Sequence, residues 1–329
     1  MNKKIVTILL IGAAFFLNAC QKNIDVFVPD AGQPNSADTT WNSTVAPTAA
    51  VFSLQTNLLV EPLRDSFEVN TTSTRVINTS NGLQITFPPN SCVTSTGAAI
   101  TGKVYLEIRF IKTKGDMILA NKPTSSNGSM LVSGGEIFLS ITKDGQPVKL
   151  APGVKIYFHY ADAPTYQQMK LFVGDESNPG QVNWLPTTNT SSLDTVIVGP
   201  QSYDIVTSHL RWINCDYFYD TTGISRSLIS TNLPSNYTNA NTAAFLVFRE
   251  LRSVLSMHAD ANERRFISDK VPNGKLVTVV VISKQGNDYF LGKESATTGV
   301  NVTVNNVQKV NVTPIKTSLA DIRAYLATL

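Results

Sequence analysis

Residues 82–160 read GLQITFPPNSCVTSTGAAITGKVYLEIRFIKTKGDMILANKPTSSNGSMLVSGGEIFLSITKDGQPVKLAPGVKIYFHY, and this stretch decides the fold class of the chain. Apolar and polar residues alternate in four short segments, at 83–87, 104–110, 137–141 and 154–158. Alternation with a period of two indicates half-buried strands, and the Gly, Pro, Asn and Asp clusters between the segments indicate tight turns. Asp144-Gly145 is a typical hairpin-turn dipeptide. The stretch therefore predicts antiparallel sheets packed as a β-sandwich.

The start of this stretch resembles a known family. Gly82, Ile85, Phe87, Pro88 and Ser91 match a G-x-x-[IVL]-x-[FIV]-P-x-x-[AS] segment. That segment opens the ZU-type β-sandwich of ankyrins and netrin receptors, and the resemblance covers residues 82–160 of the 329. It implies scaffolding and interaction rather than catalysis. A generic immunoglobulin-like sandwich gives much the same pattern and stays open as an alternative.

Further strand patterns lie on both sides of this core. Segments within 51–80 and 165–198 extend the first sandwich, and Gly199-Pro200 marks its end. Later segments predict a second sandwich, at 210–218, 244–248, 276–282, 289–291 and 300–304. We therefore predict an all-β fold with two tandem β-sandwich domains, residues 51–200 and 203–329.

The C-terminus changes from strand to helix spacing. Ser318 with Asp321 three residues later forms an acidic variant of the capping box. Apolar residues then follow on one helical face, at Leu319, Ile322, Leu326 and Leu329. A short C-terminal helix packed on the second sandwich is expected.

The N-terminus has the pattern of a lipoprotein signal peptide, residues 1–19. Lys3 and Lys4 precede the 13 apolar residues 5–17, too few to span a bilayer as a helix. Leu17-Asn18-Ala19-Cys20 resembles the lipobox of bacterial lipoproteins. The resemblance implies that Cys20 becomes the diacylated and then N-acylated first residue of the mature chain, which anchors the protein in membrane lipid.

The residues after Cys20 favour the outer membrane, because the next position is Gln21 rather than the Asp that retains some lipoproteins in the inner membrane. Periplasmic and cell-surface orientations both stay open. Residues 20–50 lack periodicity and are rich in Pro, Ser, Thr, Asn and Ala, which predicts a flexible tether. Trp41 within it either docks on the folded part or is exposed.

Charge excludes one class of partner. Removal of residues 1–19 leaves 25 of the 27 basic side chains against 24 acidic ones. Such a neutral balance provides no electrostatic case for nucleic-acid binding. Cys92 and Cys215 are the other two cysteines. A disulfide between them and two buried free thiols both remain open.

No catalytic or metal-binding pattern occurs in the sequence. His159, His209 and His258 are widely spaced and form no zinc motif, so we expect no metal, no cofactor and no enzymatic activity. Trp184 and Trp212 are candidates for a platform on which sugar rings stack, although both lie in apolar runs that also suit a sandwich core.

These observations favour a membrane-anchored envelope lipoprotein that acts as a non-enzymatic binding or structural module, with another envelope protein as its partner. A glycan-binding surface lipoprotein is the alternative, and it requires exposed tryptophans. A hydrolase is a third hypothesis. It requires ionisable groups with strongly shifted pKa values that converge in a cleft.

Overall fold

The structure is a computed structural model of the 329-residue chain, and it describes residues 36–69, 72–177, 182–187 and 194–329. Residues 34–329 form one compact unit. Cys20, the predicted signal peptide and the predicted tether up to residue 35 lie outside the described residues. The unit is mostly β-structure in several sheets with a short C-terminal helix, so the predicted all-β class is confirmed.

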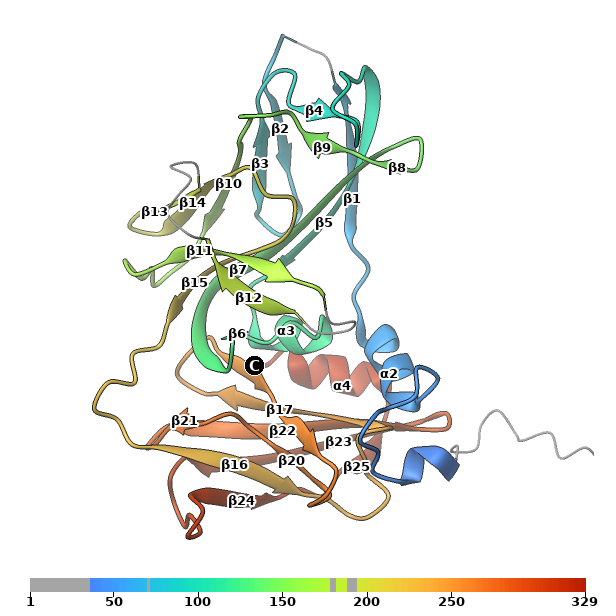
Figure 1. The fold of residues 1–329 in the computed structure, drawn as a ribbon, viewed down its shortest axis with the longest axis vertical. Coiled ribbons are helices and arrows are strands. Elements are labelled where there is room, and N and C mark those ends of the chain that lie inside the picture. The colour runs from blue at the N-terminus through green and yellow to red at the C-terminus, as the bar shows by residue number, and fades with distance from the viewer. Residues whose placement is uncertain (1–35, 70–71, 178–181, 188–193) are drawn as a thin grey trace, which may run out of the picture. The chain divides into compact units, whose positions relative to one another are not determined.

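The first sandwich packs a large sheet on a smaller one (Figure 1). The strand order of the large sheet is β1 (Leu63–Val69), β5 (Gly102–Ile111), β7 (Ser129–Lys143), β15 (Arg211–Phe218), β11 (Lys170–Asp175) and β12 (Asn183–Pro186), and β6 (Ser125–Ser126) and β8 (Gln146–Pro147) also pair with β7. The facing sheet has the order β13 (Thr195–Val198), β14 (Ser202–Thr207), β10 (Ile156–Ala161), β3 (Gln84–Phe87) and β2 (Arg75–Asn78). A short ribbon joins β4 (Cys92–Val93) to β9 (Lys149–Leu150).

The predicted alternation explains this core. In β10, Ile156, Phe158 and Tyr160 are buried between the sheets, while Tyr157 and His159 face outward. β7 and β15 are instead buried on both faces. One face packs on the small sheet, and the other is covered by helices and by the second sandwich.

The boundary predicted at Gly199-Pro200 is wrong. The backbone N–H of Gly199 donates to the carbonyl of Ser202, and this turn joins β13 to β14 as a hairpin. β14 pairs with β10, and β15 pairs with β7 and β11, so both strands belong to the first sandwich. The Gly-Pro pair makes a tight turn inside a sheet rather than a linker, because the strands on its two sides are hydrogen-bonded to each other.

The second sandwich therefore begins with β16. One sheet has the order β19 (His258–Asp260), β20 (Arg265–Ile267), β16 (Arg226–Asn232) and β21 (Val271–Pro272), and β24 (Val307–Asn311) runs parallel to β16. The other has the order β18 (Val254–Ser256), β17 (Thr242–Phe248), β22 (Leu276–Gln285), β23 (Asp288–Thr297) and β25 (Ile315–Thr317). The expected strand at 300–304 is instead an exposed loop.

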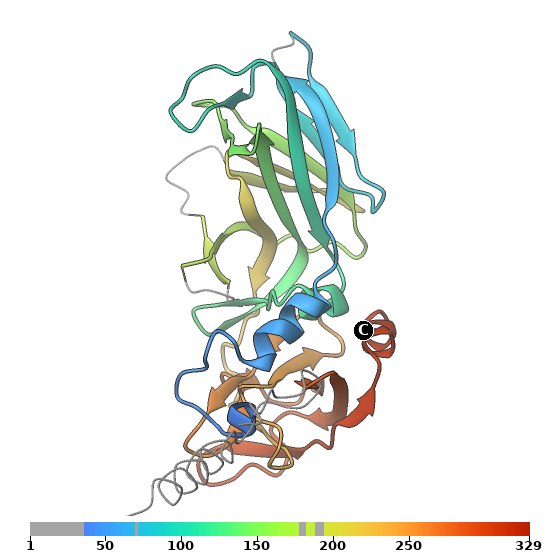
Figure 2. The ribbon, with the colours of Figure 1, turned by 90° about the vertical axis from the view of Figure 1, so that its right-hand side faces the viewer.

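Helices lie between the two sandwiches (Figure 2). They are α2 (Ala50–Leu58), α3 (Lys114–Leu119) and α4 (Leu319–Leu326). The strand expected from residue 51 onward is helix α2, in which Val51, Leu54 and Leu58 share the buried face. α4 forms as predicted, because the Ser318 hydroxyl accepts the backbone N–H of Asp321. Its buried residues Ile322 and Leu326 join a cluster that contains residues of both sandwiches.

The predicted tether differs from the structure over residues 36–50. This segment forms η2 (Ser36–Thr39) and then packs on the second sandwich. The ring of Trp41 lies 5.0 Å from that of Phe266, and the Asn42 backbone and the Asn239 side chain exchange two hydrogen bonds. Of the two alternatives for Trp41, docking on the folded part is therefore the one that the structure shows.

Candidate functional site

Trp184 and Trp212 lie in the core between the sandwiches. Trp184 is fully buried, and its Nε1 donates to the carbonyl of Pro123 at 2.8 Å. Trp212 is 6% exposed, and the two rings meet edge to face with centroids 6.3 Å apart. Neither ring offers a face to a sugar. Of the two alternatives for these tryptophans, core packing is the one the structure shows, because the outer face of this sheet is covered instead of facing solvent.

The most unusual polar groups are two buried carboxyls, Glu136 on β7 and Asp216 on β15. Both residues have no exposed surface. Glu136 is paired with Asn214 across the strands, and Asn214 Nδ2 donates to Asp216 Oδ2 at 2.7 Å. Within the described residues, both Glu136 oxygens and Asp216 Oδ1 lack a hydrogen-bond partner. Such groups cost free energy on folding, and the cost is greatest when the group is charged.

Burial controls the protonation of this pair. Desolvation raises the pKa of Glu136 well above its usual value, and the nearby Asp216 raises it further, while Lys122 acts in the opposite direction. Desolvation also raises the pKa of Asp216, against the hydrogen bond from Asn214. The protonated, neutral form of each carboxyl is therefore favoured. Shifted carboxyls are a mark of catalytic sites, but here no side-chain surface is open to a substrate.

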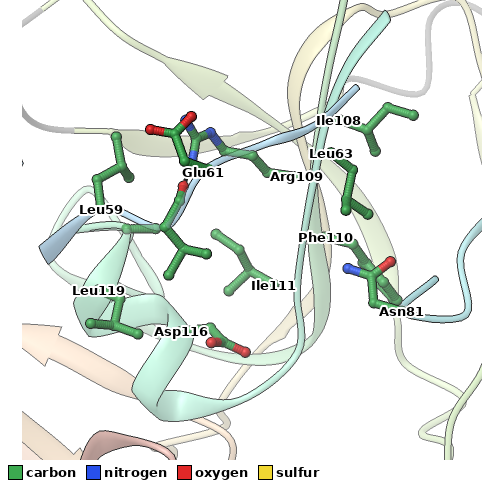
Figure 3. A pocket seen from close by; sticks show the side chains of 12 residues that line it. Leu59, Glu61, Leu63, Asn81, Ile108, Arg109, Phe110, Ile111, Asp116 and Leu119 are labelled. Atoms are coloured by element: carbon green, nitrogen blue, oxygen red, sulfur yellow. Dashed lines mark hydrogen bonds between the residues drawn. The ribbon is translucent and has the colours of Figure 1, made fainter. Parts of the chain in front are cut away.

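An open, largely apolar cavity lies elsewhere, at the foot of the first sandwich (Figure 3). Its volume is about 210 Å³. Residues that follow α2, the edge strand β1, the end of β5 and helix α3 surround it. We call it the junction groove; it is lined by Leu59, Val60, Glu61, Leu63, Asn81, Ile108, Arg109, Phe110, Ile111, Asp116, Leu119 and Ala120.

The wall and rim of the junction groove differ in character. Leu59 and Val60 are exposed apolar residues on one side, at 39% and 51%. Arg109 is already engaged, because it donates to the Val60 carbonyl and lies 3.8 Å from Glu107. Burial lowers the pKa of this guanidinium, while Glu107 and Glu61 oppose the shift. The rim adds two carboxylates, the exposed Glu61 and the half-buried Asp116.

The local sequence explains how α3 forms one wall. Thr113 caps the helix, since its hydroxyl accepts the backbone N–H of Asp116 and donates to the Asp116 carboxylate at 2.8 Å. Met117, Ile118 and Leu119 are buried in the cluster between the sandwiches. The helix therefore has a fixed position, and with it Asp116 at the rim.

The histidines and cysteines lie apart from one another. Each histidine has one carboxylate partner, at 2.7 Å for His159–Asp204, 3.0 Å for His209–Asp194 and 3.4 Å for His258–Asp269. In the described part of the chain, no group of three His, Cys, Asp or Glu residues could hold a metal ion. Cys92 and Cys215 are buried free thiols, and burial raises the pKa of both. Of the two open alternatives, the free-thiol form is present.

Sequence reasoning missed both the buried carboxyls and the junction groove. Alternation places Glu136 on the face opposite Ile137 and Leu139, and no motif in the sequence marks either carboxyl. The one sequence feature that could have marked them is a carboxyl within a largely apolar strand, in GGEIFL for Glu136 and in WINCDYF for Asp216. The groove combines four distant segments, and no local pattern marks it.

Comparisons with protein-family models and with curated proteins found no match to this chain. Among the described residues, no helix has both the length and the apolar character required to cross a membrane.

Proposed function

We propose that this protein is an outer-membrane lipoprotein, anchored through acylated Cys20, whose tandem sandwiches act as a non-enzymatic binding module for another envelope protein. The signal-peptide pattern and the Leu17–Cys20 segment support the anchor. The ZU-type resemblance of residues 82–160 supports an interaction role. The observation that carries the binding role is the junction groove, which is open and largely apolar.

The lining of the junction groove defines the partner. A volume of about 210 Å³ admits one or two side chains rather than a folded element. Leu59, Val60 and Leu63 offer apolar contact. The two rim carboxylates are already engaged, Glu61 by Arg64 and Asp116 by Thr113. We expect the partner to be an extended protein segment that presents an aliphatic or aromatic side chain to the groove. Such anchors contribute most where they fill a desolvated pocket.

The anchor and the groove are tested separately. Full-length tagged protein and its Cys20→Ala variant are compared by detergent phase partition and by affinity purification from solubilised envelopes. We expect wild type in the detergent phase and the variant outside it. If wild type and Cys20→Ala partition alike, the anchor proposal fails. This result is independent of any partner that binds the groove.

The groove is tested with Val60→Asp, which adds a charge at an exposed position and should leave folding intact. Ile197→Asp is the matched control, because Ile197 is 54% exposed on β13 of the other sheet. We expect a stoichiometric partner with wild type and with Ile197→Asp, and its loss with Val60→Asp. Equal recovery of a partner in all three, or recovery of this protein alone, contradicts a binding role for the groove.

A further inference from the structure

One end of the second sandwich exposes a row of valines. Residues 299–306, here called the valine tip, read GVNVTVNN and contain no helix or strand. Val300, Val302 and Val304 are exposed at 47%, 40% and 104%. Solvent-exposed valine singly is ordinary, but three in one short loop form a patch that water solvates poorly.

Two polar side chains of the valine tip, Thr303 and Asn306, fasten the loop, and they are exposed like the valines. The Thr303 hydroxyl accepts the backbone N–H of Val307, and Asn306 Nδ2 donates to the carbonyl of Arg226. At the base, Gln308 accepts from the Gly299 backbone and donates to the Thr297 carbonyl. These hydrogen bonds hold the loop in place, while its three valines stay exposed to solvent.

Neighbouring loops extend the patch. The Gly274 backbone donates to Thr298, the Asn273 backbone to Ser225 and the Arg249 backbone to Leu276, so these loops meet at one end of the sandwich. They add exposed Leu276 and Ile224, at 42% and 37%. The exposed basic residues here are Arg226, Arg249 and Lys270, and Lys275 is half-buried. The exposed acidic residues are Asp220 and Glu250.

We infer that the valine tip inserts into the surface of the lipid bilayer that holds the anchor. An apolar tip with surrounding cations suits a membrane with anionic headgroups, where apolar burial and electrostatic attraction add. This inference rests on the proposed anchor at Cys20 and adds a second contact with the same bilayer.

The chain is long enough for both contacts. Residues 38–42 dock near Thr238–Asn241, beside the end of β17 that pairs with Ser283, whereas Leu276 marks the opposite end of β22. A ten-residue strand such as β22 spans about 33 Å. The 16-residue step from Cys20 to Ser36 reaches about 55 Å at most. An anchor at Cys20 can therefore reach the bilayer that the tip contacts.

The test places an environment-sensitive nitrobenzoxadiazole label on Val304→Cys in full-length acylated protein. Cys92 and Cys215 are buried, so the new thiol is the reactive one among the described cysteines. The matched control carries the label at Ile197→Cys. Each protein is reconstituted into phosphatidylethanolamine–phosphatidylglycerol vesicles, and flotation first confirms attachment.

We expect a blue shift of emission at position 304 and severalfold stronger quenching by spin-labelled lipid than at position 197. If the protein floats but the label at 304 stays water-like, the inference is overturned and the anchor stands. A blue shift without lipid quenching means that a second copy covers the tip, which also overturns the inference. If the protein does not float, the anchor fails and the inference fails with it.

Discussion

Arg252 of the second sandwich holds Asp162 of the first through two hydrogen bonds, of 2.8 and 3.0 Å. The Asp162 side chain is only 4% exposed, and Lys112 Nζ lies 3.3 Å from the same carboxylate. Arg252 also donates to the carbonyl of Gly134. A two-pronged pair of this kind fixes the orientation of the two sandwiches, and its partners are far apart in the chain.

Replacing Arg252 by Met is expected to destabilise the protein by about 3 kcal/mol, because the buried Asp162 loses its main partner. Urea denaturation followed by tryptophan fluorescence measures the change. Lys316→Met is the matched control, since the Lys316–Asp288 pair is exposed and should contribute less than about 1 kcal/mol. Equal effects of the two substitutions would contradict the role assigned to Arg252.

Glu136→Gln tests the buried carboxyl pair through the pH dependence of stability. A carboxyl whose pKa is raised on folding binds a proton in the folded protein. The effect of Glu136 on the free energy of unfolding is therefore most favourable below the pKa of the carboxyl in the unfolded chain. It becomes less favourable as pH rises from that pKa toward the higher pKa of the folded protein. The wild-type free energy of unfolding should fall relative to the variant as pH rises above the unfolded pKa of 4.5, by at most about 1.4 kcal/mol per pH unit.

The control for that experiment is Glu294→Gln, at an exposed position on β23. It should leave the pH dependence of unfolding unchanged. Parallel curves for wild type and Glu136→Gln would show that the Glu136 carboxyl does not take up a proton on folding.

Gly115→Ala probes the contact between α3 and α4. A β-carbon at Gly115 would lie 2.0 Å from the carbonyl oxygen of Leu326, so one helix has to move. The expected loss is about 1–3 kcal/mol, as for other overpacked sites. Thermal unfolding measures the loss. An unchanged melting temperature would mean that the helices separate freely.

Trp184→Ala is expected to cost about 3–5 kcal/mol, in the range of other truncations of core aromatic residues. Trp184→Phe keeps most of the ring but leaves the Pro123 carbonyl without its donor, at a cost of about 1–3 kcal/mol. Denaturant titration ranks the two. A stable Trp184→Ala protein that loses affinity for a soluble glycan would restore the stacking hypothesis.

Strands could be predicted from sequence where one face meets the core and the other meets water. Ile156 and Phe158 illustrate this, because the alternation at 154–158 predicts a strand and both residues are buried in β10. The rule fails in β7 and β15, because their second face is covered by elements that lie far away in sequence. Alternation alone therefore assigns Glu136 to the solvent face, and it leaves Trp212 as a candidate for sugar stacking.

Helix α2 was missed for a different reason. Val51, Leu54 and Leu58 have helical spacing, but the helix begins after Ala49, whose side chain makes no capping hydrogen bond. Without a start signal, the apolar run resembled a strand. The junction groove could not be predicted at all, since Leu59, Asn81 and Ile108 come together only after both sheets have formed.

The docking of residues 36–58 has a consequence for the order of assembly during synthesis or export. The Val51 backbone donates to the Ala240 carbonyl, and Asn57 Nδ2 donates to the Tyr289 hydroxyl. These partners emerge roughly 200 residues later, and Arg323, which donates to the Asn57 carbonyl, emerges later still. The earliest described segment is thus among the last to find its place. A nascent chain that stalls before β17 and β22 have formed leaves α2 without the strands on which it packs.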